Sequence, residues 1–290
     1  MLQAWIQATR PRTLVAAVVP VAVGCSLAKA ANGFTPVPAL LCLGFALLVQ
    51  MATNFANDYY DFKKGADGPG RLGPARTVAS GLIEPRTMRR AMVLVLALAF
   101  VVGLGLLSHG GPMLLAVGIA SLVCAVAYTG GPWPLAYLGL GDVFVVVFFG
   151  LVAVAFTFFV QVGEFSRDVL LAGLGVGLIT NNLLVVNNFR DVEEDRLSRK
   201  KTLAVRFGRR FSLWQFWLQT LGAGACTAWV TAVDKWFWLV PLLVLGLMGR
   251  RVVSKLAKAR ARPEFGECLG LSAQMVPVFG VLLCGGILFP

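Results

Sequence analysis

Residues 37–61 read VPALLCLGFALLVQMATNFANDYYD, an apolar run that ends in asparagines and aspartates. The first charged residue of this stretch is Asp58, so the part over residues 37–55 carries no charge. An α-helix needs roughly 20 apolar residues to cross the hydrocarbon core of a membrane. We therefore expect a transmembrane helix here, with its polar end at the membrane surface.

The rest of the chain shares this apolar character. Of its 290 residues, 58% are hydrophobic and 14% are charged, whereas soluble proteins have about half and about a quarter. Nine apolar runs are present, and none alternates polar and apolar residues as the strands of a membrane β-barrel do. They cover residues 14–30, 37–55, 91–107, 113–128, 140–160, 169–188, 211–233, 236–249 and 269–289. The pattern predicts an all-α membrane protein, a single domain over residues 1–290 with nine transmembrane helices.

The positive charges are distributed as nine crossings require. The N-terminus would share one side of the membrane with the connections 58–90, 129–139, 190–210 and 250–268, and these five segments hold 23 of the 26 Lys and Arg residues. Because cytoplasmic loops of membrane proteins are enriched in Lys and Arg, we expect these segments to be cytoplasmic. The same rule explains the net charge of +12 without a nucleic-acid partner. The composition excludes a soluble enzyme and a nucleic-acid-binding module.

Two polar motifs lie where the second and the sixth predicted helices reach the cytoplasm. They are NFANDYYD, residues 54–61, and NNFRDVEED, residues 187–195. The residues that share a helical face are Asn54, Asp58 and Asp61 in the first motif and Asn187, Asp191 and Asp195 in the second. The second face requires the sixth helix to continue as far as residue 195.

The chemistry of these motifs points to a metal-bound diphosphate. Solvated helix ends would explain one or two carboxylates but not a repeated asparagine–carboxylate face, and polar residues at this depth are functional candidates. Oxygen ligands without His or Cys suit Mg²⁺, which binds through a few carboxylates and substrate phosphates. Nearby cations that could neutralise phosphate charge are Lys63, Lys64, Arg71, Arg76, Arg190, Lys200 and Lys201. We expect two Mg²⁺ ions to hold a diphosphate between the motifs, and the membrane location implies a lipid substrate.

Two other activities stay open at this stage. A cation-coupled transporter would also use paired acidic helices, although its polar residues would lie near the membrane midplane rather than at one face. A pair of acids for glycoside hydrolysis would need neither the repeated asparagines nor so much positive charge. Release of diphosphate from a polyprenyl diphosphate would separate an enzyme from a transporter.

The motifs resemble those of the UbiA superfamily of membrane prenyltransferases, in the forms NxxNDYxD and NNxRDxxxD. The resemblance covers nearly the whole chain. Further stretches that carry it are ATRPRTL (8–14), GPARTVASGLI (73–83), YTGGPWPLAYLGLGD (128–142) and KKTLAVRFG (200–208). Within the superfamily, the chain looks similar to the 1,4-dihydroxy-2-naphthoate polyprenyltransferases of menaquinone biosynthesis. The resemblance implies transfer of a polyprenyl chain from polyprenyl diphosphate to this aromatic acid, with loss of CO₂ and diphosphate, giving demethylmenaquinone. The alternative is a related enzyme for another acceptor such as 4-hydroxybenzoate.

This reaction suggests a division of labour among the candidate residues. We assign Asp58, Asp61, Asp191 and Asp195 to Mg²⁺, and Tyr128 to the face of the allylic cation. The candidates for substrate binding are Asn54, Asn57, Arg71, Arg76, Asn187 and Lys201. Because the carboxylates would sit at a wet rim, replacing Asp58 or Asp191 should reduce activity more than folding. The enzyme would be integral to the bacterial cytoplasmic (inner) membrane, in contact with its lipid, with its N-terminus and active site on the cytoplasmic side.

Overall fold

The computed structural model describes residues 1–67, 72–73, 75–231 and 239–289, and every regular element in these ranges is a helix. The expected all-α class is therefore confirmed. The elements are α1 (Leu2–Thr9), α2 (Pro11–Ala30), α3 (Pro36–Lys63), α4 (Pro85–Gly110), α5 (Met113–Ala127), α6 (Leu135–Leu138), α7 (Gly141–Val145), the π-helix η1 (Val146–Val152), α8 (Ala153–Val162), α9 (Arg167–Arg190), α10 (Val192–Leu197), α11 (Leu203–Val230), α12 (Leu239–Leu256) and α13 (Arg262–Leu288).

Within the described residues each apolar run falls on a helix, with α7, η1 and α8 forming a single continuous unit. Residues 232–238, at the ends of the predicted runs 211–233 and 236–249, lie outside the described residues. Within the described ranges, six of these helices are long and apolar enough to cross a membrane: α2, α3, α4, the α7–α8 unit, α9 and α13. The apolar helix α5 is shorter, at 15 residues, and α11 and α12 do not meet the same criteria. The chain is thus a helical membrane protein, and the count of nine crossings stays a prediction.

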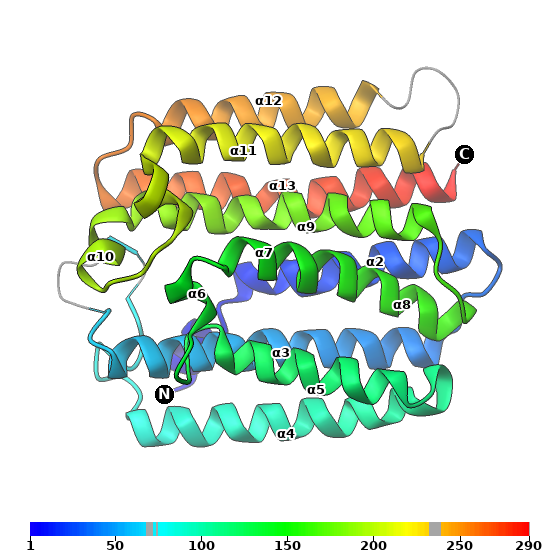
Figure 1. The fold of residues 1–290 in the computed structure, drawn as a ribbon, viewed down its shortest axis with the longest axis horizontal. Helices are drawn as coiled ribbons and strands as arrows, with labels where there is room; N and C mark the ends of the chain where they lie inside the picture. The colour runs from blue at the N-terminus through cyan, green and yellow to red at the C-terminus, as the bar shows by residue number, and fades with distance from the viewer. Residues whose placement is uncertain (68–71, 74, 232–238, 290) are drawn as a thin grey trace.

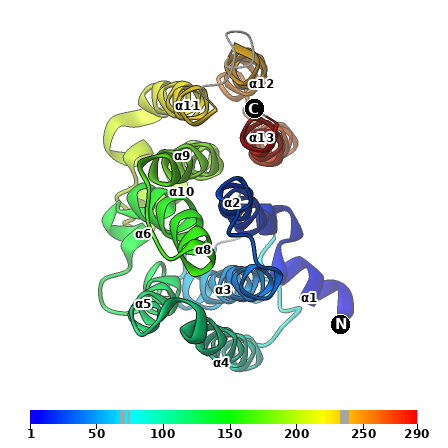
Figure 2. The ribbon, with the colours of Figure 1, turned by 90° about the vertical axis from the view of Figure 1, so that its right-hand side faces the viewer.

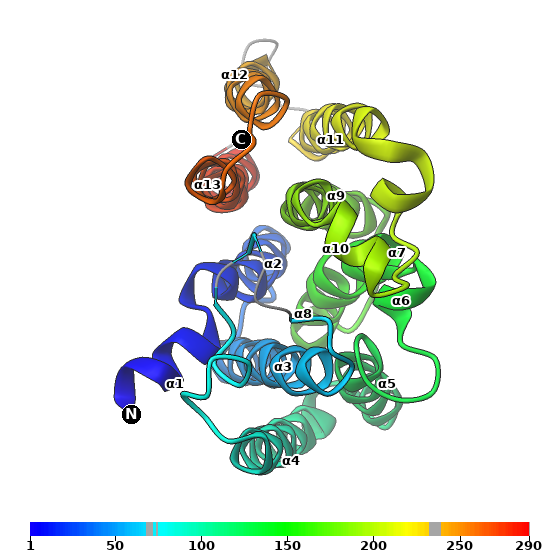
Figure 3. The same ribbon diagram turned by 90° about the vertical axis from the view of Figure 1, so that its left-hand side faces the viewer.

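The long helices run side by side along one direction (Figure 1). The N-terminus, α6, α10 and the α3–α4 and α12–α13 connections all lie at one end of the bundle, the end that faces the viewer in Figure 3. We call this the motif end. The C-terminus lies at the opposite end, as an odd number of crossings requires. The five segments that the charge distribution placed on one side are therefore together.

Helix α9 is the central element of the bundle. In its most apolar stretch 72% of the residues are buried, against 17% for the peripheral helix α4. Figure 2 shows α9 with α11 and α13 on one side and α2 and α8 on the other. The main apolar core is built around it, from residues such as Val176, Ile179, Phe216 and Phe279. This central position makes α9 a fixed support for the second acidic motif, which follows it.

Glycines allow the π-helix η1 to pack closely against α9. A Cβ atom on Gly150 would lie 2.4 Å from the carbonyl oxygen of Gly173, and one on Gly177 would lie 2.6 Å from that of Val146. Small residues let membrane helices approach this closely. Single π-turns inside α-helices are frequent at functional sites, and here the turn carries Phe148 to the wall of the internal cavity described below.

We expect Gly177→Ala to lower the apparent melting temperature of the protein in detergent. The new methyl group would meet the backbone of η1, which cannot move aside as a flexible side chain can. Overpacking of this kind costs about 1–3 kcal/mol. Gly246→Ala in α12 is the matched control, because nothing lies within 4 Å of the added methyl group. Equal melting temperatures for the two variants would contradict the close packing of η1 on α9.

Candidate active site

The first motif forms one buried face of α3, as its spacing predicted. Helix α3 continues to Lys63, and Asn54, Asp58 and Asp61 are each only 2% exposed. Asn54 lies deepest, and its Nδ2 donates to the backbone oxygen of Thr9 at 2.9 Å. This bond ties α3 to the turn between α1 and α2. Asn54 therefore holds the N-terminal segment in place.

Asp58 anchors the loop that leads into α4. Its Oδ2 accepts hydrogen bonds from the Thr77 hydroxyl at 2.6 Å and the Thr77 backbone N–H at 3.2 Å, and its Oδ1 accepts from the Val78 N–H at 3.5 Å. The expectation that this carboxylate sits at a wet rim is wrong, because the α3–α4 loop folds back over it. Asp58 orders the loop that also carries Arg76.

Asp58→Asn should therefore reduce stability as well as activity. The amide would turn a donor toward the donors of Thr77 and Val78, and an unsatisfied buried group costs about 1–3 kcal/mol. We expect a lower apparent melting temperature in detergent without substrate or metal. Glu164→Gln, in an exposed turn at the opposite end of the bundle, is the control and should match the unchanged protein. An unaltered melting temperature for Asp58→Asn would show that the loop is held by other contacts.

Asp61 is the centre of the polar site at the motif end. Its carboxylate accepts a hydrogen bond from the Tyr137 hydroxyl at 3.0 Å, and it lies 3.4 Å from Nη2 of Arg76 and 3.6 Å from Nζ of Lys200. Lys64 and Lys200 both lie over the Tyr137 ring, with Nζ 4.3 and 4.9 Å from its centroid. Burial, and then the charge of Asp61, raise the pKa of the Tyr137 phenol, so the hydroxyl stays a donor.

The second motif departs from its predicted geometry. Helix α9 ends at Arg190, Asp191 caps it outside the helical region, and Asp195 belongs to the separate helix α10. The expected continuous face from Asn187 to Asp195 is therefore wrong. The physical reason is local: the Arg190 guanidinium binds both carboxylate oxygens of Asp191, with Nη2 2.6 Å from Oδ2, and the chain turns there. Asn187 remains half-buried on the last turn of α9.

The break brings Asp195 close to the first motif. Lys200 Nζ lies 3.7 Å from Oδ1 of Asp195 and bridges it to Asp61. A second link joins the two halves of the site, since Oε1 of Glu194 accepts a hydrogen bond from the backbone N–H of Leu72 at 2.6 Å. The two motifs, which are far apart in the chain, thus face each other with Lys200 between them.

The other predicted residues take varied positions. The side chain of Lys201 is exposed, and its backbone N–H donates to the backbone oxygen of Tyr137 at 2.9 Å. Lys200, and not Lys201, therefore meets the carboxylates. Asn57 accepts a hydrogen bond from the Thr129 hydroxyl at 2.9 Å. Arg71 lies outside the described residues. The single histidine, His109, lies in the last turn of α4, at the opposite end of the bundle.

Tyr137 is the main residue that the sequence interpretation missed. It falls in the stretch 128–142, which carried the family resemblance, but its role depends on contacts with Asp61, Lys64 and Lys200 that no local pattern reveals. Lys64 and Lys200 were visible only as members of a basic group. Burial lowers the pKa of Lys64, an effect that the charge of Asp61 partly offsets.

The donor set fits a divalent cation held together with a phosphate. Among the described residues, no three Asp, Glu, His or Cys side chains come close enough to hold a metal ion by themselves. Asp61 and Asp195 nevertheless approach one positive charge from two different elements. Carboxylate oxygens from two sides, completed by water and phosphate, are the coordination that Mg²⁺ prefers.

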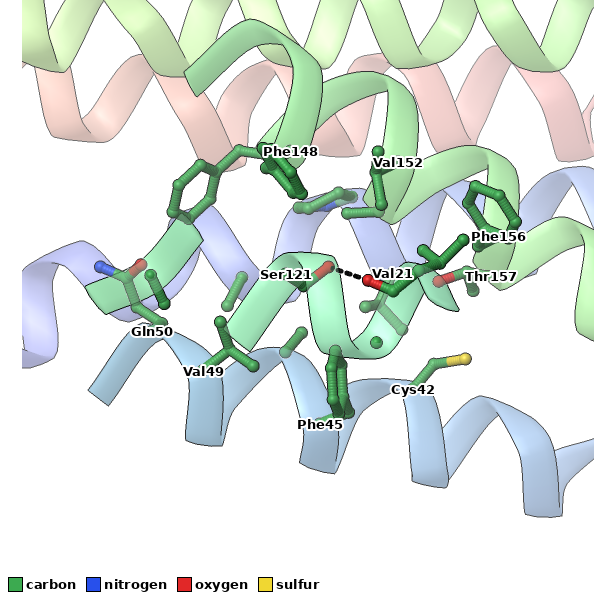
Figure 4. Close-up of a pocket in the computed structure, with 18 of the residues that line it drawn as sticks. Val21, Cys42, Phe45, Val49, Gln50, Ser121, Phe148, Val152, Phe156 and Thr157 are labelled. Carbon is green, nitrogen blue, oxygen red and sulfur yellow. Dashed lines mark hydrogen bonds between the residues drawn. The ribbon is translucent and has the colours of Figure 1, made fainter. Parts of the chain in front are cut away.

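An apolar cavity of about 160 Å³ lies inside the bundle (Figure 4). It lies between α2, α3, α4, α5 and the α7–α8 unit, and Figure 4 shows Val49, Phe148 and Phe156 around it. Along α3 its wall runs from Thr53, one turn before Asn57, to Cys42, a distance of about 16 Å at 1.5 Å per residue. Tyr128 lines the end of the cavity next to the polar site.

These features define a class of protein: a helical membrane protein with opposed buried carboxylates at one end of the bundle and an apolar cavity inside it. The comparisons with known proteins give the particular family. The UbiA prenyltransferase family matches residues 17–265, and the chain belongs to this family.

Similar proteins extend over nearly the whole chain. It is 33% identical to the 1,4-dihydroxy-2-naphthoate octaprenyltransferase of Escherichia coli, over 97% of this chain and 96% of that protein. It is 37% identical to the enzyme of the same name from Haemophilus influenzae, over 71% of this chain and 70% of that one. The fold is that of a UbiA homologue from Archaeoglobus fulgidus solved with DMAPP and Mg²⁺, at a TM-score of 0.67 and 15% identity, covering 97% of this chain and 99% of that one.

Proposed function

We propose that this protein transfers a polyprenyl group from polyprenyl diphosphate to 1,4-dihydroxy-2-naphthoate, with release of diphosphate and CO₂, in menaquinone biosynthesis. The observation that carries the proposal is the meeting of Asp61 and Asp195 with Arg76 and Lys200, at the end of the bundle beyond an apolar cavity. The similarity to 1,4-dihydroxy-2-naphthoate octaprenyltransferases along nearly the entire chain supports the choice of acceptor.

In this proposal the protein stabilises the departing diphosphate. Carboxylates of both motifs would hold two Mg²⁺ ions, which would supply Lewis-acid stabilisation of the leaving charge. Arg76, Lys64 and Lys200, which lie around Asp61 and Tyr137, would bind the remaining phosphate oxygens. The apolar wall holds the prenyl chain and excludes water from the allylic carbon. The face of Tyr128 at the cavity head favours the positive charge that develops there.

The acceptor then completes a balanced exchange of bonds. The allylic carbon–oxygen bond breaks and its electron pair leaves with the diphosphate. The ring carbon that carries the carboxylate forms the new carbon–carbon bond, and CO₂ leaves while its bonding electrons restore the aromatic ring. No proton has to leave a ring carbon, which agrees with a site that lies at the other end of the bundle from the single histidine.

The decisive experiment offers the purified protein two acceptors in one reaction. 1,4-Dihydroxy-2-naphthoate and 4-hydroxybenzoate compete for octaprenyl diphosphate with Mg²⁺, and mass spectrometry identifies the products. We expect prenylated naphthoquinol and one CO₂ for each diphosphate released. Faster prenylation of 4-hydroxybenzoate without CO₂ would overturn the acceptor assignment while leaving prenyl transfer in place.

We further propose that the protein lies in a bacterial inner membrane with the motif end in the cytoplasm. The concentration of 23 Lys and Arg residues in the five segments of this end supports that orientation.

A cysteine placed at each end of the bundle should react differently in intact cells. Glu193→Cys lies on α10 at the motif end and Glu164→Cys in the turn at the other end, and both positions are exposed. An impermeant maleimide should label Glu164→Cys in intact cells and Glu193→Cys only after permeabilisation. The unchanged protein gives the background from its six native cysteines, all buried or half-buried. Labelling of Glu193→Cys in intact cells would reverse the orientation.

A further inference from the structure

Lys200 forms ion pairs with carboxylates of both motifs. Its Nζ lies at nearly the same distance, 3.6 and 3.7 Å, from one oxygen of Asp61 and one of Asp195. All three side chains are largely buried, with exposures of 14%, 3% and 9%. One ammonium therefore stands between two carboxylates that come from opposite halves of the molecule.

These separations exceed those of hydrogen-bonded charge pairs, which lie at about 2.7–2.9 Å. The neighbouring pair of Asp191 and Arg190 shows the contrast, since its Nη2–Oδ2 distance is 2.6 Å and it is bidentate. Arg190 therefore binds Asp191 tightly, whereas Lys200 lies farther from each of its two carboxylates. A loosely held cation is the easier one for an incoming ion to replace.

Burial explains why a cation is held there at all. A buried carboxylate without a counter-charge is strongly destabilising, and two facing each other repel as well. Lys200 lies close to both Asp61 and Asp195 and so offsets the charge of each. It occupies the kind of position, between opposed carboxylate oxygens, that suits a divalent ion.

The Lys200 ammonium also has a second possible binding position, the face of the Tyr137 ring. The Tyr137 ring lies 4.9 Å from Lys200 Nζ, and the face of an aromatic ring attracts cations. Tyr137 is fixed by its hydrogen bond to Asp61, and Lys64 already lies over the same ring at 4.3 Å. A small movement along this ring would take Lys200 off the carboxylates and keep it within the site.

We propose that Lys200 is a built-in counter-ion that competes with the divalent cation for Asp61 and Asp195, and that it moves over Tyr137 to the diphosphate when the metal binds. The second clause rests on the proposed function. The first depends only on the metal and the protein. The proposal predicts effects of opposite sign when Lys200 is removed, namely tighter binding of metal alone and weaker binding of the prenyl diphosphate.

The test measures Mn²⁺ binding to the full chain in detergent, without substrate, by electron paramagnetic resonance of the free ion. We expect Lys200→Gln to bind Mn²⁺ about fivefold more tightly than the unchanged protein, and to melt at a lower temperature in EDTA. Arg196→Gln is the matched control, since it removes one positive charge from the same segment at a side chain that is 61% exposed and pairs with Glu193. Its Mn²⁺ affinity should stay within twofold of the unchanged protein.

Two further measurements make the outcome decisive. Lys200→Arg keeps the competing charge and should not tighten Mn²⁺ binding. This variant tests the proposal even if Lys200→Gln folds poorly. In steady-state assays, Lys200→Gln should raise the KM for octaprenyl diphosphate about tenfold. Unchanged or weaker Mn²⁺ binding by Lys200→Gln would overturn the proposal. Tighter Mn²⁺ binding in a protein that prenylates neither acceptor would overturn the proposed function and leave the counter-ion role in place.

Discussion

Asp195→Asn is expected to lower the rate of prenyl transfer by about 100-fold or more. Asp195 is the only carboxylate of the second motif that the structure brings, within its described part, into an ion pair shared with Asp61. Losing a negative ligand removes stabilisation of the leaving diphosphate, and each 1.36 kcal/mol lost from the transition state costs about tenfold in rate. A loss of a few kcal/mol therefore gives the expected factor.

The measurement is release of diphosphate at saturating substrates, over a range of Mg²⁺ concentrations. The control is Glu193→Gln, which removes the same charge from the same helix at a side chain that is 63% exposed, and which should keep near-full activity. EDTA should abolish activity of the unchanged protein, and added Mg²⁺ should restore it. Wild-type rates for Asp195→Asn, or full activity in EDTA, would contradict a role for this carboxylate in metal-assisted transfer.

Replacing the four candidate carboxylates one at a time should not affect activity equally. Asp61 and Asp195 face each other, so Asp61→Asn should be as damaging as Asp195→Asn. Asp58 is occupied by the α3–α4 loop, and Asp191 is held by Arg190. Asp58 and Asp191 could bind a metal ion only if these contacts rearranged. The four carboxylates are therefore not equivalent as metal ligands.

Helical spacing predicted the first motif well because one continuous helix carries it. The apolar run of α3 passes directly into Asn54–Asp61 without a helix-breaking residue, and i, i+4, i+7 spacing then determines which side chains share a face. The position of the motifs at one end of the bundle followed from charge, because Lys and Arg mark the ends of helices at one membrane surface. Both arguments use only local information.

The second motif shows where local information stops. The sequence of Asn187 to Asp195 has no proline or glycine, so nothing in it indicated that the helix ends at Arg190. The end of α9 depends on the ion pair between Arg190 and Asp191. It also depends on the following segment, which turns back so that the Lys201 N–H reaches the backbone oxygen of Tyr137. The choice of Lys200 over Lys201 has the same origin, since adjacent residues point in different directions and only the tertiary fold determines which one meets Asp61.

Ser121→Phe is expected to separate long prenyl donors from short ones. Ser121 lies on α5, is 8% exposed and lines the apolar cavity, where Figure 4 shows it bonded to a backbone oxygen of its own helix. A cavity of about 150 Å³ can hold a benzene ring, so a phenyl group at this position would fill much of the 160 Å³ available.

In Ser121→Phe, a 40-carbon donor could no longer bury the far part of its chain in the cavity. A 10-carbon donor needs only the part of the cavity next to the polar site. Each buried CH₂ contributes about 0.8 kcal/mol, and displacement of most of one five-carbon unit would cost a few kcal/mol. We expect kcat/KM for octaprenyl diphosphate to fall about 100-fold and that for geranyl diphosphate by tenfold or less. Val123→Phe, on the same helix but 59% exposed, adds the same ring outside the cavity and should leave both values near those of the unchanged protein. Equal losses with the two donors in Ser121→Phe would mean that the long chain follows another path, because a blocked cavity must affect the donor that needs its full length more strongly.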